Sequence, residues 1–215
     1  MNAYSGKRFC VLSNSVSTYE GYTPASAVFY DAYYQSISGV TSVNDTWWMQ
    51  VINRLGGVLG INDSYSGSTV YGTQPTAGCS DLRIAALGKN GTPDVILIYM
   101  GGNDWRFNIL PERFSNAYRT MLSKLTQFYP NAEIWCATLL QGHKVDNTIP
   151  AFRTAKVHHP QRLYSDLIRK EVSAAGCHIA DLGESTYPAS DGVHPTREGM
   201  CLLAQRWLRA IENTL

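Results

Sequence analysis

The chain has 215 residues, of which 44% are hydrophobic, so it can bury a substantial core, and we expect a single domain over residues 1–215. Its formal net charge is +1 and only 16% of its residues are charged. This composition argues against nucleic acid or an anionic membrane as a partner and favours a small, neutral or sugar-like ligand. The oligomeric state is left open.

The five cysteines are an odd number, and no Cys-x-x-Cys spacing occurs among them. Three of them, Cys10, Cys136 and Cys177, lie in apolar runs where a free thiol behaves as a small hydrophobic group. We therefore expect no metal, no cofactor and a reducing, cytoplasmic compartment. The first eight residues carry no apolar signal segment, and secretion after removal of such a segment is the alternative.

The first predicted element is a strand over Phe9–Leu12, which is followed directly by Ser13, Asn14 and Ser15. Four successive apolar residues between charged and small polar residues are typical of a strand that is buried on both faces. In open parallel α/β sheets, ligands bind outside the carboxyl ends of the strands. The three polar residues would therefore enter such a crevice.

Residues 18–43 are rich in Tyr, Ser and Gly and show no clean periodicity, so we interpret them as an ordered loop. Loops of this length in compact domains are usually functional. Aromatic faces suit sugar rings or acyl chains, which makes Tyr19 a candidate substrate contact, although packing explains most of the aromatic residues here. These residues are Tyr19, Tyr22, Phe29, Tyr30, Tyr33 and Tyr34.

The rest of the chain alternates between helical and strand-like patterns. Apolar residues at helical spacing, with capping residues ahead of several of them, predict helices over 47–55, 82–87, 114–128, 161–175 and 197–211. Apolar runs predict further strands over 58–62, 95–100, 133–140 and 177–182. Alternation of this kind predicts an α/β protein with a mostly parallel sheet and helices on both faces.

Four loops after predicted strands hold small or polar residues. They are Ser13-Asn14-Ser15, Ser66-Gly67-Ser68, Gly101–Asp104 and Asp191–Pro195. In the last loop the Asp191 carboxylate can hold Nδ1 of His194, which leaves Nε2 to point elsewhere. A general base for a hydroxyl nucleophile needs this fixed tautomer and orientation, and Ser15 would be the hydroxyl.

Together these residues resemble the blocks of the SGNH (GDSL-type) hydrolase superfamily. Those blocks supply a Ser, a Gly, an Asn, and a His with an Asp three residues before it. The chain presents them in order as Ser15, Gly67, Asn103 and Asp191-x-x-His194. Each block is short and weak by itself, but four in order, each after a predicted strand, are a specific signal.

The resemblance implies a flavodoxin-like, three-layer α/β/α sandwich around a five-stranded, mostly parallel sheet. It also implies hydrolysis of a small-molecule acyl ester, short-chain or carbohydrate-linked, with acetyl as an example. Ser15 would attack the carbonyl carbon, His194 would take the proton, and Asp191 would orient the imidazole. The backbone N–H groups of Ser15 and Gly67 and the side-chain amide of Asn103 would form the oxyanion hole.

The usual Gly-Asp-Ser of that superfamily reads here as Ser13-Asn14-Ser15. Asn14, a candidate substrate contact, keeps one acceptor but loses a negative charge near the nucleophile. This departure motivates the alternative of a weakened or inactive carbohydrate-binding domain. A thioesterase or lysophospholipase is a further alternative, whereas a flavin or nucleotide binder lacks the glycine-rich phosphate loop it would need.

Three further positions carry weaker expectations. Asp104 is a candidate structural support, because Asn and Asp commonly stabilise turns. A substrate contact is the alternative. His143 follows the fourth predicted strand and is a candidate substrate contact. His158 and His159 are neighbours with divergent side chains, so we expect a solvent-exposed loop there rather than a metal site.

Overall fold

The computed structural model describes residues 3–145, 147–152 and 156–214 and contains a central sheet of five parallel strands. Their order across the sheet is β2-β1-β3-β4-β6, so the first strand lies inside it. The strands are β1 (Arg8–Asn14), β2 (Val58–Tyr65), β3 (Val95–Tyr99), β4 (Glu133–Ala137) and β6 (His178–Ala180). The predicted α/β class and five-stranded sheet are confirmed.

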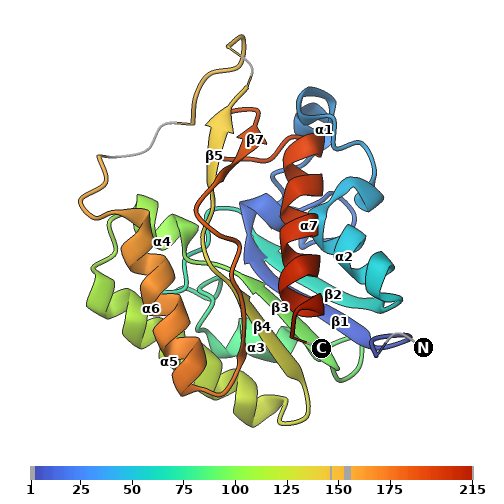
Figure 1. Cartoon of the computed structure of the whole chain (residues 1–215), viewed down its shortest axis with the longest axis vertical. Helices are drawn as coiled ribbons and strands as arrows, with labels where there is room; N and C mark the ends of the chain where they lie inside the picture. Colours follow the sequence, from blue (N-terminus) through green and yellow to red (C-terminus); the bar gives the residue numbers. More distant parts are fainter. Residues whose placement is uncertain (1–2, 146, 153–155, 215) are drawn as a thin grey trace.

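Helices cover both faces of this sheet (Figure 1). On one face α2 (Trp47–Leu55) packs against α7 (Arg197–Glu212). On the other, α5 (Pro111–Phe128) packs against α3 (Asp81–Ala86) and α6 (Gln161–Ala174). The chain thus forms the three α/β/α layers, and the predicted helices and strands alternate as expected.

The core lies between the layers and fixes the two central strands. All residues of Phe9–Leu12 in β1 and of Val95–Ile98 in β3 are fully buried. On the helical side, the indole rings of Trp47 and Trp207 stack at 5.1 Å and join α2 to α7. Burying one large apolar side chain contributes roughly 1.5–3 kcal/mol to stability, so this core holds the strand ends in fixed positions.

The prediction of a loop over residues 18–43 is wrong for its middle part. This segment contains the helix α1 (Ala32–Ser38) and the short 3-10 turn η2 (Ala25–Ala27), and a further 3-10 turn, η3 (Val43–Asp45), begins at its last residue. The Asp31 carboxylate caps α1 by accepting from the backbone N–H of Tyr34 at 3.0 Å, and Gly39 ends it. Two turns of helix are too short to show an apolar period, so only these end signals marked it.

Three further differences concern short elements at the carboxyl edge of the sheet. β4 ends at Ala137, and the chain then forms β5 (Gln141–Lys144), which pairs in parallel with β7 (Thr186–Ala189). The Gly102–Arg106 segment forms a short helix, α4, and β2 runs on to Tyr65. Strands and helices of four or five residues are too short to give a readable pattern.

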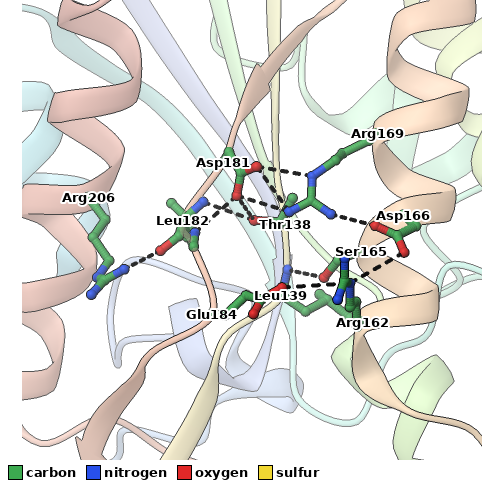
Figure 2. Close-up of polar contacts among 11 residues, drawn as sticks. Thr138, Leu139, Arg162, Ser165, Asp166, Arg169, Asp181, Leu182, Glu184 and Arg206 are labelled. Atoms are coloured by element: carbon green, nitrogen blue, oxygen red, sulfur yellow. Dashed lines mark hydrogen bonds and ion pairs between the residues drawn. The ribbon is translucent and has the colours of Figure 1, made fainter.

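A polar cluster fixes the segment that follows β6 between α6 and α7 (Figure 2). The Thr138 hydroxyl donates to the Asp181 carboxylate at 3.2 Å and accepts from the backbone N–H of Leu182 at 2.9 Å. Arg169 of α6 binds the same carboxylate at 3.0 Å, and Arg206 of α7 donates to the Leu182 carbonyl. This anchored segment leads into β7 and then into the loop that carries His194.

Candidate active site

Ser15 lies where β1 ends and is the first residue of a 3-10 turn, η1 (Ser15–Ser17). The Asn14 side-chain carbonyl caps this turn by accepting from the backbone N–H of Val16 at 3.3 Å. The Thr18 hydroxyl closes it by donating to the Ser15 carbonyl at 3.0 Å. An Asn carbonyl can make this cap as a carboxylate would, so the turn tolerates Asn14.

Ser17 holds the turn against the sheet and α2. Its hydroxyl accepts from the indole N–H of Trp47 at 2.9 Å, and its carbonyl accepts from the indole N–H of Trp48 at 2.9 Å. The Asn62 amide of β2 donates to the same carbonyl at 2.8 Å. Because all four side chains are buried, the position of Ser15 is fixed by satisfied hydrogen bonds.

The loop after β7 brings His194 to Ser15. Nε2 of His194 lies 2.9 Å from Oγ of Ser15, and Nδ1 lies 2.7 Å from Oδ2 of Asp191. Oδ1 of Asp191 accepts from the backbone N–H groups of Val193 and His194 at 2.9 and 2.8 Å. Because the carboxylate can only accept, this network assigns the proton to Nδ1 and leaves Nε2 able to accept from the serine hydroxyl.

The imidazole of His194 is covered by aromatic rings that sequence reasoning did not assign to the site. The ring of Phe29 stacks on it at 3.4 Å between centroids, and Phe152 meets it edge-on at 5.5 Å. The Tyr30 hydroxyl donates to the Pro195 carbonyl at 2.8 Å and so ties the same segment to the histidine loop. The aromatic content of residues 18–43 was the available signal, but it did not single out Phe29.

This environment sets the charge states of the pair. Burial lowers the pKa of His194 below its ordinary value of 6.5, although the Asp191 carboxylate acts in the opposite direction. Burial raises the pKa of Asp191, but hydrogen bonds from His194 and from the backbone outweigh it, and the pKa lies below its ordinary value. At neutral pH the site therefore holds a neutral imidazole and an ionised carboxylate.

Asn103 and Asp104 connect α4 to the loop after β2. The Asn103 amide donates to the Ser68 carbonyl at 2.8 Å. The fully buried carboxylate of Asp104 accepts from the backbone N–H groups of Val70 and Tyr71 at 2.8 and 3.0 Å. Asp104 thus supports the loop that precedes it in the sequence.

Gly67 is exposed in that loop, one residue before Ser68. Its φ of +75° lies in the left-handed region that favours glycine. The expected role of its backbone N–H in an oxyanion hole stays a prediction.

A narrow cleft with a volume of about 20 Å³ opens beside Ser15. Its apolar walls are the side chains of Tyr99, Leu139, Leu140, Tyr187 and Val193, and its polar lining includes Asn14, Asn103 and Arg106. A site of this size holds a group of one or a few heavy atoms. Among the described residues that line it, Arg106 is the only charged one.

Of the four predicted substrate contacts, the structure brings Asn14 to the cleft and places the other three elsewhere. Tyr19 is buried, and its hydroxyl donates to the Gln35 side chain at 3.3 Å. Asp104 is bound by backbone N–H groups, as described above. His143 lies on β5 with Nδ1 2.8 Å from the Thr186 hydroxyl.

A buried arginine that sequence reasoning missed supports the end of β1, just before Ser15. Arg83 of α3 binds the Asp63 carboxylate at 2.6 Å and donates to the carbonyls of Ser13 and Thr76 at 2.9 and 2.7 Å. It therefore joins the carboxyl ends of β1 and β2. Removing one partner of such a buried pair commonly costs about 3–5 kcal/mol, so this contact is structural.

Two features of the described chain bear on metals and membranes. No group of three or more His, Cys, Asp or Glu side chains in it is arranged to hold a metal ion. The expected loop at His158 and His159 is present, and the backbone N–H of His158 donates to the Asn108 side chain at 2.8 Å. Within the same residues, every helix is too short or too polar to cross a membrane.

Comparison with known proteins points to one family. The family model for GDSL-like lipase/acylhydrolase matches residues 7–150. A candidate GDSL-like lipase from Bacteroides uniformis has 25% identity and a TM-score of 0.73, with 97% of this chain and 96% of that chain covered. One from Bacteroides ovatus has 22% identity and a TM-score of 0.73, with 98% and 100% covered.

A more distant structure is a family two carbohydrate esterase from Clostridium thermocellum in complex with cellohexaose. It has 15% identity and a TM-score of 0.65, with 98% of this chain and 65% of that chain covered. At this identity the likeness concerns the fold alone. Among curated proteins, the search finds no match to this sequence.

Proposed function

The chain belongs to the GDSL-like lipase/acylhydrolase family, and on this basis we propose that it is a serine esterase that hydrolyses short-chain acyl esters. One observation carries the proposal: Oγ of Ser15 lies 2.9 Å from Nε2 of His194, whose Nδ1 is held by Asp191. The three residues come from both ends of the chain, so we treat residues 1–215 as one hydrolase domain.

The chemistry follows from the proton positions in this arrangement. Ser15 attacks the carbonyl carbon while its proton passes to Nε2 of His194, and Asp191 stabilises the imidazolium that forms. His194 then gives the proton to the leaving alcohol, which departs and leaves an acyl-enzyme. Water attacks that ester with the same base, which releases the acid and restores Ser15.

The negative charge on the tetrahedral intermediate needs donors that are already in place. We assign this role to the backbone N–H groups of Ser15 and Gly67 and to the side-chain amide of Asn103. The Asn103 amide is oriented by its bond to the Ser68 carbonyl, which supports this assignment. Each such donor typically contributes on the order of a hundredfold to a thousandfold in rate.

The size of the cleft favours a small acyl group such as acetyl. A cavity of about 20 Å³ beside the nucleophile has no room for a long hydrocarbon chain, which a thioesterase or lysophospholipase would need to bury. The alternative of a weakened or inactive domain is motivated by Asn14. The side chain of Asn14 still caps the turn that carries Ser15, which favours an active site. The carbohydrate esterase among the structural neighbours is consistent with a sugar-linked ester.

We expect activity to fall steeply with acyl length. In a series of 4-nitrophenyl esters, kcat/KM should drop about tenfold or more from acetate to hexanoate, because the longer chain cannot enter the cleft without displacing Leu139 or Leu140. Steady-state kinetics at one pH measures this. Rising activity along the series would favour a long-chain acylhydrolase.

The acidic limb of the pH profile should report His194. Since only the neutral imidazole accepts the serine proton, and burial lowers the pKa of His194, kcat/KM should be half-maximal below pH 6.5. Phe29→Ala lets water reach the ring and should move this midpoint upward, toward the ordinary value. Phe128→Ala, an exposed phenylalanine on α5, is the matched control and should leave it in place. A midpoint that stays fixed in Phe29→Ala would contradict the assigned role of burial.

A further inference from the structure

Arg106 is a buried cation to which the mechanism gives no role. Only 8% of its surface is exposed, and no hydrogen bond or ion pair among the described residues involves its guanidinium. Its contact is with the ring of the preceding residue, Trp105, at 5.2 Å. Arg83, by contrast, is enclosed in the core and is bound by one carboxylate and several carbonyl oxygens. A guanidinium that lines a cleft and has no carboxylate or carbonyl bound to it among the described residues can bind an anionic ligand there.

The helix α4 explains why this charge faces the cleft. Arg106 follows Asn103 by three residues, a spacing that places two side chains on the same face of a helix. Both line the narrow cleft beside Ser15. The positive charge is also one of the smaller influences, after burial, that hold the pKa of His194 down.

Arg106 also lines a second, wider cavity. This groove has a volume of about 270 Å³ and shares Arg106 and Val193 with the cleft. Trp105, Gln141 and Phe152 contribute two aromatic rings and an amide to its walls, and its charged lining consists of Arg106, Lys144 and Asp191. The Asp191 carboxylate is already bound by His194 and by backbone N–H groups, so the two basic residues remain to face a ligand. Arg106 therefore borders both the space for the acyl group and a space large enough for the alcohol half of an ester.

We propose that the substrate is a short-chain ester whose alcohol half bears a carboxylate, and that Arg106 binds this carboxylate as a specificity-determining residue. The inference rests on the proposed esterase function. The carboxylate belongs to the alcohol half because the acyl cleft is too small to hold it besides the acyl group. A planar guanidinium matches a carboxylate with two parallel hydrogen bonds. An acidic sugar that carries an acetyl ester has this chemistry.

Two esters of the same shape separate charge recognition from general activity. 4-Acetoxybenzoate carries a carboxylate where 4-acetoxybenzamide carries a neutral amide. For each protein, kcat/KM for the benzoate is divided by kcat/KM for the benzamide. The intrinsic reactivity of each ester is the same with every variant, so it cancels when this ratio is compared between variants. We expect Arg106→Gln to lower the ratio by about tenfold to a hundredfold, the usual effect of a charge-assisted bond. Arg106→Lys keeps the charge but loses the pair of parallel hydrogen bonds, so it should lower the ratio less.

Arg162→Gln is the matched control, since Arg162 is 74% exposed on α6 and belongs to the cluster in Figure 2. It should leave the ratio unchanged. A ratio that Arg106→Gln does not alter, or an equal loss for both esters, would overturn carboxylate recognition while leaving the esterase proposal intact. Failure of the wild-type protein to hydrolyse either ester would count against the esterase proposal instead. If Arg106→Gln does not fold, a wild-type preference for the benzoate that does not weaken with added salt overturns the proposal.

Discussion

Ser15→Ala should lower kcat/KM for 4-nitrophenyl acetate by at least about 10⁴-fold. The substitution removes the hydroxyl whose oxygen lies 2.9 Å from Nε2 of His194. Without it no acyl-enzyme can form, and only the oxyanion donors and substrate binding remain to promote attack by water. The measurement is steady-state hydrolysis, with circular dichroism to verify that the variant is folded.

Ser17→Ala is the matched control for this prediction, because it removes another buried hydroxyl from the same turn. It should cost about 1–3 kcal/mol of unfolding free energy, since the indole N–H of Trp47 loses its acceptor. It should retain far more activity than Ser15→Ala. Equal activity of the Ser15→Ala variant and the wild-type protein would remove Ser15 from the chemistry.

Asp191→Asn should reduce kcat by about 10⁴-fold while the loop stays folded. An amide at this position can still accept, through one oxygen, from the backbone N–H groups of Val193 and His194. Its N–H₂ group would face Nδ1 of His194, however, and two donors cannot pair. The imidazole would therefore carry its proton on Nε2 and could no longer accept from Ser15.

Asp181→Asn tests whether the effect belongs to the position. Asp181 is also tied to its surroundings by several hydrogen bonds, but it lies in the cluster at the ends of β4 and β6. It should lose stability and keep most of its activity. A loss of less than tenfold in Asp191→Asn would show that orientation of His194 does not depend on the carboxylate.

The family and the main frame of the fold follow from signals that are local in the sequence. Phe9–Leu12 and the run of residues 95–100 are apolar enough to be central strands, and β1 and β3 occupy those positions. The four short blocks occur in the expected order, and this order identifies the family from the sequence alone. Three of them follow β1, β2 and β3, whose carboxyl ends share one edge of the parallel sheet. The Asp191–His194 loop instead follows β7, which pairs with β5 outside that sheet.

What could not be predicted depends on contacts between distant segments. Phe29 differs in no visible way from the tyrosines around it, and only the fold stacks it on His194. Arg106 is one basic residue in a chain of nearly neutral charge, and net composition favoured a neutral ligand. Its burial beside Ser15 becomes apparent only once α4 is placed. The short strands β5 and β7 have no apolar pattern of their own, and each is a strand only because it pairs with the other.

The most direct test of the proposed chemistry is labelling with a fluorophosphonate, followed by peptide mapping. The proposed mechanism predicts one phosphonyl group per chain, on Oγ of Ser15, and its loss in Ser15→Ala. Folded wild-type protein that stays unlabelled, or that carries its label on another residue, would contradict it.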